Sequence, residues 1–438
     1  MTKHVVDGIA HILPERRPRA SRRSLLLSAV AILALAACQP QPSQQAAQPE
    51  PAPVSTPDAA AIHAAVLTLD SHADVLLPST PKRYYAPDGG SRVSLDKLAA
   101  GGLDAIVLSV AVGPGPRDAA GVKAARAEAD AKLAIIKAIP TQSGGKAEIA
   151  LSAADVERLH SQGKIAIIIG FQNARSIGKD VSQLDVFYRE GARVFALNHA
   201  GHNDFSDSSR PQDGPISEHR GLSPLGKQAV ARLNDLGALI DVSQLSSDAL
   251  AQTLQLTRAP VAATHSDARA LIDNTRNLSD AELDAIKANG GVVQVTPFNA
   301  YLSVPDAVAS AKISEIRVAN GLPADFKAWN DGYGSLKGDK QQAFLDQAGA
   351  LVPRADIAKY VDHIAYIAKR IGWDHVGVGT DFDHGAGIAG FDSEADAPNV
   401  TAELVKRGYT QEQIAGIWGG NFLRVWKAAE AAKAAPAP

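Results

Sequence analysis

Side chains that can bind a divalent ion or carry a proton stand at the ends of several apolar runs in this sequence. In chain order they are His72, Asp74, Gln172, Asn198, His199, Gln244, His265 and Asp381. Imidazole and carboxylate groups are ligands of zinc and similar divalent ions. In an extended stretch, residues i and i+2 point to the same side, so His72 and Asp74 could bind one ion together. The set indicates a metal-dependent hydrolase.

Asp381 lies in the segment 379–385 (GTDFDHG). A carboxylate at the end of the last predicted strand could accept a proton from an attacking water and return it to a leaving amine. The alternative is that Asp381 caps the following helix or forms a local ion pair. For each histidine taken alone, the alternative is a structural hydrogen bond.

From residue 60 onward, short apolar runs alternate with longer helical patterns. Nearly continuous apolar runs are typical of parallel strands that are buried on both faces. Among the helical patterns, residues 223–236 are marked by Pro224 in the first turn and by Gly237 as a stop. The predicted strands are Val66–Asp70, Leu103–Val110, Ile165–Gly170, Arg193–Leu197, Ala238–Val242, Val261–Thr264, Val292–Thr296 and Val376–Thr380.

Eight strands that alternate with helices predict an α/β fold, a closed (β/α)8 TIM-like barrel. An open doubly wound sheet is the alternative, but no glycine-rich nucleotide-binding motif follows a predicted strand. Residues 303–352 interrupt the alternation between the seventh and eighth strands, and we interpret them as an insertion over one face of the barrel. In such a barrel the polar residues named above converge at the carboxyl ends of the strands.

The composition excludes several classes of protein. The 438 residues include 44 basic and 47 acidic ones, a formal net charge of −3, which gives no electrostatic case for binding nucleic acid. A hydrophobic fraction of 45% argues against wholesale disorder. The single cysteine excludes an intramolecular disulfide.

Residues 1–37 predict a lipoprotein export signal. Several arginines precede an apolar run from Leu25 to Ala37, which is shorter than the about 20 residues that span a bilayer. The segment 21–26 (SRRSLL) resembles a twin-arginine signal, and the segment 35–38 (LAAC) resembles a bacterial lipobox. The alternative is an ordinary secretory signal. We therefore predict a protein of the bacterial cell envelope that is anchored in a membrane through a lipid on Cys38.

The remaining boundaries follow from composition. Residues 38–59 are rich in Pro, Gln and Ala and are predicted to form a disordered tether. Residues 60–430 are the predicted hydrolase barrel, and residues 431–438 are a tail rich in Ala and Pro.

An ordered set of motifs resembles the membrane dipeptidases (renal dipeptidases), a branch of the amidohydrolase superfamily. The resemblance covers roughly residues 60–430 and implies a metallo-barrel with two zinc ions that hydrolyses dipeptides. Relatives in this family are often dimers, so a homodimer is implied. The motifs are residues 69–74 (LDSHAD), 98–102 (LAAGG), 197–199 (LNH), 221–226 (GLSPLG), 264–266 (THS), 275–277 (TRN) and 379–383 (GTDFD).

The resemblance also implies residue roles. His72 and Asp74 would bind one metal ion, and His265 would belong to the second. Asp381 would be the proton shuttle, and His199 would polarise the scissile carbonyl and bind the oxyanion. The residues implied to contact the substrate are His199, Asn198 and Arg276, the last through the free carboxylate of the dipeptide.

Two positions depart from the family pattern. The family has a glutamate after the third strand, where this chain has Gln172, and a histidine after the fifth, where it has Gln244. Neutral amides offset the repulsion between two cations less well than a bridging carboxylate does. We therefore expect one strong metal site and a weak or absent second site. The alternatives to a dipeptidase are a relative that only binds a peptide or small ligand, and a single-metal hydrolase of another amide.

Overall fold

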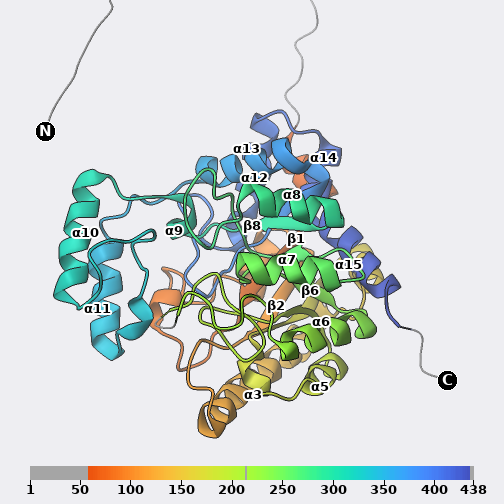
Figure 1. Ribbon diagram of the computed structural model, residues 1–438. Coiled ribbons are helices and arrows are strands. Elements are labelled where there is room, and N and C mark those ends of the chain that lie inside the picture. Colours follow the sequence, from red (N-terminus) through yellow and green to blue (C-terminus); the bar gives the residue numbers. More distant parts are fainter. Residues whose placement is uncertain (1–57, 213–214, 435–438) are drawn as a thin grey trace, which may run out of the picture. The chain divides into compact units, whose positions relative to one another are not determined.

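The computed structural model describes residues 58–212 and 215–434, and the predicted barrel is confirmed (Figure 1). Eight parallel strands follow one another in the order β1-β2-β4-β5-β6-β7-β8-β9. The segment after β9 returns to β1, where the amide of Asp381 donates to the carbonyl of His72 at 2.7 Å, so the barrel is nearly closed. The strands are β1 Leu69–Asp74, β2 Ala105–Ala111, β3 Ala147–Ile149, β4 Ile165–Gln172, β5 Ala192–Ala196, β6 Leu239–Asp241, β7 Ala262–Ala263, β8 Val292–Val295 and β9 Val376–Val378.

Strand β1 differs most from its prediction. It runs four residues beyond Asp70, so His72 and Asp74 lie within the strand and not after it. The register against β2 shifts between Asp70 and Ala73, which is the signature of a bulge with one extra residue. The apolar pattern predicted an end for this strand that is too early, because the last residues of β1 include polar side chains that are buried at the barrel mouth.

Helices cover the outside of the barrel. Helix α6 shows how the sequence sets their bounds: Ser223 accepts a hydrogen bond from the amide of Gly226, Pro224 occupies the first turn, and Gly237 ends the helix with a φ of 69°. The helices are α1 Ala59–Ala65, α2 Leu95–Ala100, α3 Ala119–Gln142, α4 Ala153–Ser161, α5 Gln183–Arg189, α6 Pro224–Leu236, α7 Ser247–Leu256, α8 Asp280–Asn289, α9 Asn299–Leu302, α10 Ala307–Ala319, α11 Gly338–Gly349, α12 Ile357–Ile371, α13 Ala397–Lys406, α14 Gln411–Ala415 and α15 Asn421–Ala431.

The predicted insertion lies between β8 and β9. Helices α10 and α11 stand beside the barrel in Figure 1 and pack on a hydrophobic cluster of their own that includes Ile313 and Phe344. The chain between these two helices carries Trp329 and Tyr333, which line a cavity together with Asp381. The insertion therefore covers part of the barrel mouth.

None of the described helices combines the length and the apolar character that crossing a membrane requires. The predicted export signal, most of the predicted tether and Cys38 lie outside the described residues. So do the last four residues of the predicted tail.

Candidate metal centre and active site

Three predicted site residues meet at the carboxyl ends of the strands. His72 of β1, His265 after β7 and Asp381 after β9 each offer a ligand atom, and these atoms lie within 4.8 Å of one another. The rings of His72 and His265 stack with centroids 3.9 Å apart, and His72 Nε2 lies 3.8 Å from Asp381 Oδ1. Among the described residues His72 Nε2 has no hydrogen-bond partner, although it is buried. A buried orphan nitrogen beside a carboxylate fits a divalent ion.

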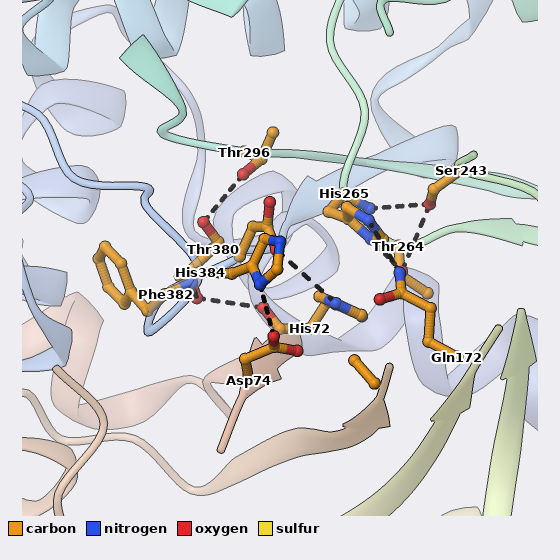
Figure 2. Close-up of polar contacts among 12 residues, drawn as sticks. His72, Asp74, Gln172, Ser243, Thr264, His265, Thr296, Thr380, Phe382 and His384 are labelled. Atoms are coloured by element: carbon orange, nitrogen blue, oxygen red, sulfur yellow. Dashed lines mark hydrogen bonds and ion pairs between the residues drawn. The ribbon is translucent and has the colours of Figure 1, made fainter. Parts of the chain in front are cut away.

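A hydrogen-bond chain fixes the tautomer of His265 (Figure 2). The hydroxyl of Thr264 donates to Asp241 Oδ2 at 2.6 Å and lies 2.8 Å from His265 Nδ1. Because a threonine hydroxyl has one proton, Thr264 must accept from His265 Nδ1, which leaves Nε2 with its lone pair. Partners of this kind orient metal-binding histidines and raise their basicity.

The two glutamines lie beside His265. The amide nitrogens of Gln172, the last residue of β4, and of Gln244 lie 3.4 Å and 3.3 Å from His265 Nε2. Both side chains are buried. The structure thus brings both departures from the family pattern to one place, and they supply neutral amides there.

Burial sets the protonation of the metal group. It raises the pKa of Asp381, and the nearby carboxylate of Asp74 adds to the effect. It lowers the pKa of His265 well below the ordinary range, with further contributions from His72 and Arg276. Asp381 also has a φ of 55°, a strained conformation for a residue other than glycine and one that clusters at functional sites.

A second polar cluster lies beside the metal group. His384 Nδ1 lies 2.7 Å from Asp74 Oδ2, and His384 Nε2 lies 3.1 Å from His199 Nε2; Figure 2 shows His384 directed toward Asp74. Lys132 of α3 lies 3.8 Å from the same oxygen of Asp74. Asp74 therefore lies next to the metal group without belonging to it, and its role as a ligand stays a prediction.

Charges within this cluster oppose burial. Burial alone would raise the pKa of Asp74, but Lys132 and His384 outweigh it and hold that pKa well below its usual range. Burial alone would lower the pKa of His384, but Asp74 and Asp381 raise it. Burial and His384 lower the pKa of His199 well below its usual range. Of the two histidines, His384 is therefore the one whose protonated form the surroundings favour.

Neither His384 nor Lys132 was among the predicted site residues. His384 follows Asp381 in the segment 379–385, so its place after the last strand was an available signal. Lys132 lies in the middle of α3, on the same buried face as Ala129 and Ile136, so its helical spacing with these apolar residues was an available signal.

Two implied substrate residues have structural partners. Asn198 donates from Nδ2 to the carbonyl of Ser206 at 3.1 Å, which shapes the loop after β5. Arg276 is buried and donates to the carbonyls of Ser243 and His265, at 2.6 Å each. Neither Asn198 nor Arg276 lines the cavity above the metal group.

That cavity has a volume of about 240 Å³. Its floor includes His199, Gln244, Asp381 and His384, and its walls are aromatic. A hollow of about 360 Å³ adjoins it and includes Asp74 and Lys132. A larger hollow of about 610 Å³ lies near the starts of β2 and β4, but none of the predicted site residues lines it. The aromatic wall residues are Tyr84, Phe298, Tyr301, Trp329 and Tyr333.

A parallel barrel with imidazole and carboxylate groups at its mouth defines a metal-dependent hydrolase class. Within that class, residues 57–437 match the family model described as "Membrane dipeptidase (Peptidase family M19)". The chain belongs to this family.

Individual relatives agree with this assignment. Dipeptidase tcpJ of Claviceps purpurea is 30% identical over 284 residues, 65% of this chain and 55% of the relative. Dipeptidase 3 of Macaca fascicularis is 28% identical over 343 residues, 78% of this chain and 59% of the relative. The chain thus spans little more than half the length of these curated relatives.

Solved structures share the fold. The crystal structure of the probable dipeptidase PvdM from Pseudomonas aeruginosa has 37% identity and a TM-score of 0.78, over 85% of this chain and 98% of that one. A metallopeptidase from Rhodobacter sphaeroides, solved with a phosphinate mimic of L-Ala-D-Ala, has 22% identity and a TM-score of 0.64, over 83% and 99%. At that identity the second likeness supports the fold alone.

Proposed function

We propose that this protein is a metal-dependent dipeptidase. The observation that carries the proposal is the group His72, His265 and Asp381, of which Asp381 lines a small cavity. Its volume of about 240 Å³ lies below the about 300–1,000 Å³ typical of pockets for drug-sized ligands, which favours a dipeptide over a longer peptide. Membership of the membrane dipeptidase family supports the same reading.

The ion that we propose is zinc, held by His72, His265 and Asp381. Two imidazoles and one carboxylate are a common zinc donor set, and catalytic sites of this kind keep a further position open. What zinc supplies when bound is Lewis acidity, which lowers the pKa of water and polarises a carbonyl.

In this proposal Asp381 moves the proton. Its carboxylate accepts a proton from the attacking water and returns it to the nitrogen of the leaving amine. A carboxylate has two oxygens, so Asp381 can contact the ion through one and exchange the proton through the other.

His199 binds the oxyanion, and His384 makes it a donor. His384 carries the extra proton and donates through Nε2 to His199 Nε2, so the one proton of neutral His199 must sit on Nδ1. That nitrogen is buried and has no partner among the described residues. A preorganised N–H of this kind stabilises charge that develops in the transition state. Asp74, which accepts from His384 Nδ1, holds the pair in place.

We propose that only one ion is bound strongly. Gln172 and Gln244 offer neutral amides, and His384 occupies Asp74 Oδ2. Metal analysis of the purified chain should find about one tightly held equivalent, and Gln172→Glu combined with Gln244→His should raise the number to two. Two tight equivalents in the unaltered chain would refute the single strong site.

The direct test adds zinc, cobalt or manganese to metal-free protein and screens L-L and L-D dipeptides. We expect turnover that depends on the metal. The two glutamines also favour a second candidate function, a family member that binds a peptide or small ligand without hydrolysis. Measurable binding with no turnover under any metal would establish that candidate instead.

We propose that the chain is exported and anchored in a membrane of the bacterial cell envelope through Cys38. The arginine-rich start, the apolar run and the LAAC sequence support this. Cys38→Ala should move the protein from the membrane fraction to the soluble fraction. The homodimer implied by the family resemblance stays a prediction, which light scattering of the purified protein tests.

A further inference from the structure

Two guanidinium groups line the cavity beside the metal group. Arg210 lies on the loop after β5, Arg83 lies on the segment after β1, and both line the cavity together with Asp381. Both arginines are partly buried. The cavity therefore carries positive charge of its own, in addition to that of the ion proposed for the metal group.

The hydrogen-bond partners of both guanidinium groups are neutral. Nη1 of Arg210 donates to the hydroxyl of Tyr301 at 3.0 Å. Arg83 donates from Nη1 to Gln342 Oε1 at 2.6 Å and from Nη2 to the hydroxyl of Tyr84 at 3.0 Å. In the part of the chain that the structure describes, no carboxylate oxygen lies within 4.0 Å of either group. Because a guanidinium has five N–H donors, Arg210 in particular has donors available for an anion.

The carboxylates near these arginines have other partners. Asp381 belongs to the metal group. Asp346 lines the cavity, but it is exposed and accepts from a glutamine amide at 2.7 Å. Asp331 lies farther than 4.0 Å from both guanidinium groups, and its Oδ2 accepts from the amide of Ala328 at 2.8 Å. The charge of the two arginines is therefore available to a ligand.

The loop that carries Arg210 is tied to the catalytic residues. The amide of Arg210 donates to Ser208 Oγ at 3.2 Å, and that hydroxyl donates to the carbonyl of His199 at 2.8 Å. The amide of Ser209 donates to the carbonyl of Gln244 at 3.0 Å. The guanidinium therefore has a fixed place relative to the oxyanion-binding histidine, as a residue that positions substrate must have.

Tyr301 lies between Arg210 and Arg276. The guanidinium of Arg276 lies 5.4 Å from the centre of the Tyr301 ring, and Arg210 donates to the hydroxyl of the same ring. Arg276 Nε is buried and has no partner among the described residues, which agrees with the role in binding the free carboxylate that the family resemblance implies. A dipeptide bound in that way has its C-terminal residue beside Tyr301, so its C-terminal side chain is the part that reaches Arg210.

We propose that the substrates are dipeptides whose C-terminal side chain carries a carboxylate, and that Arg210 binds this side-chain carboxylate. The planar guanidinium matches the two oxygens of a carboxylate, and Arg83 adds a second positive charge to the same cavity. The main-chain carboxylate keeps its own subsite. This inference rests on the proposed dipeptidase function and names the substrate class of the same site.

The test compares L-Ala-L-Glu with L-Ala-L-Gln, which have nearly the same shape and the same main-chain carboxylate. With the zinc-loaded full chain we expect kcat/KM to be about 30-fold higher for L-Ala-L-Glu, because its side chain forms a charged hydrogen bond. In Arg210→Met, kcat/KM for L-Ala-L-Glu should fall about 100-fold, mainly through KM, because a desolvated charge pair is lost. For L-Ala-L-Gln the change should stay within about threefold. Arg210→Lys keeps the charge without the two-pronged geometry, so its loss for L-Ala-L-Glu should be smaller.

Arg193→Met is the matched control. Arg193 also lies over a tyrosine ring, that of Tyr188, at 4.1 Å, but it sits at the start of β5 and away from the cavity. It should leave kcat/KM for both dipeptides unchanged. Equal losses for the two dipeptides in Arg210→Met, or no loss for either, would overturn the proposal. So would a loss with L-Glu-L-Ala in place of L-Ala-L-Glu, because the acidic side chain would then belong to the N-terminal residue.

Calorimetric titration separates this inference from the proposed function. If the unaltered chain hydrolyses neither dipeptide but binds L-Ala-L-Glu more tightly than L-Ala-L-Gln, and Arg210→Met abolishes that preference, the role of Arg210 stands and the dipeptidase function fails. If the two dipeptides bind equally to the unaltered chain, the role of Arg210 fails whether or not turnover occurs, and no variant is needed to show it.

Discussion

Two groups of buried side chains share the mouth of this barrel, and they differ in whether their members bond to one another. In the metal group, His72 Nε2 has no partner among the described residues, and the second nitrogen of His265 is held by Thr264. In the neighbouring group, Asp74, His384 and His199 bond to one another in sequence. The first group is incomplete without a cation. The members of the second hold one another in place and leave His199 Nδ1 without a partner among the described residues, so its role is to orient a donor.

The same contrast governs the two carboxylates. Asp381 and Asp74 are both buried, and burial pushes both pKa values upward. Only Asp74 has Lys132 within 3.8 Å and a histidine at 2.7 Å, and its pKa falls. The cationic neighbours thus decide which carboxylate stays ionised and which can carry a proton.

The largest effect is expected at Asp381. Asp381→Asn removes the proton carrier, so kcat should fall about 1,000-fold when measured at saturating zinc. Asp383→Asn is the control, because Asp383 is also buried but accepts from Ser91 Oγ and from the amide of Arg92. It should lower the free energy of unfolding, whereas its kcat should fall much less than that of Asp381→Asn. Similar losses of kcat in both variants would contradict the separate role of Asp381.

A smaller effect is expected in the group of Asp74, His384 and His199. His384→Ala removes the donor that sets the tautomer of His199, so kcat should fall about 100-fold, the cost of one oxyanion donor. Zinc content should stay unchanged, because His384 is outside the metal group. Loss of zinc in this variant would erase the distinction between the two groups.

His384 also predicts the direction in which kcat changes with pH. Asp74 and Asp381 raise the pKa of His384 above its ordinary value, so the proton it donates to His199 is kept to a higher pH than in a free imidazole and is lost as the pH rises through that pKa. In the unaltered chain kcat should therefore decline on the alkaline side. His384→Ala has no such proton to lose, and its profile should lack that decline.

The fold was largely accessible from the sequence. All eight predicted strands overlap strands of the barrel, because runs such as Ile165–Gly170 are apolar on both faces. The prediction missed the end of β1 because it followed apolar residues, whereas His72 and Asp74 are polar residues that are buried. Strand β3 was missed too, because it is three residues long and pairs only with β4.

The site was accessible only in part. Chain topology was enough to bring His72, Gln172, Gln244, His265 and Asp381 together, because each lies at or beyond the carboxyl end of a strand. It could not reveal which atom bonds to which, and so it did not show that Asp74 pairs with His384. Lys132 reaches the mouth from the buried face of α3, where its helical spacing was a signal. Arg210 lines the cavity from a long loop, which has no periodic pattern.

Thr264 offers a subtler way to weaken the metal group. Thr264→Val keeps the shape of the side chain but removes the hydroxyl that accepts from His265 Nδ1. Zinc affinity should fall about 10–100-fold, as for other partners of metal-binding histidines. Competition with a chelator measures the affinity. Thr401→Val is the control, since Thr401 bonds to His63 and Trp418, far from the ion, and should leave zinc affinity intact.

A buried histidine outside both groups should affect stability alone. His363 accepts from the amide of Ala268 at 3.1 Å, and burial lowers its pKa from 6.5 to about 4. Above pH 6.5 it is neutral in the folded and unfolded chain, so it has no effect there. As the pH falls toward 4, the unfolded chain binds a proton that the folded chain does not. By pH 5 this should remove about 2 kcal/mol from the free energy of unfolding.

Glutamine can accept the same hydrogen bond without titrating, so His363→Gln should reduce the loss of stability between pH 7 and pH 5 by about 2 kcal/mol. Urea unfolding of the metal-free protein at both pH values measures it. Removing the metal matters, because release of the ion in acid would otherwise add its own loss of stability. If both chains lose stability equally between pH 7 and pH 5, the acid sensitivity lies in other groups and His363 is not its source.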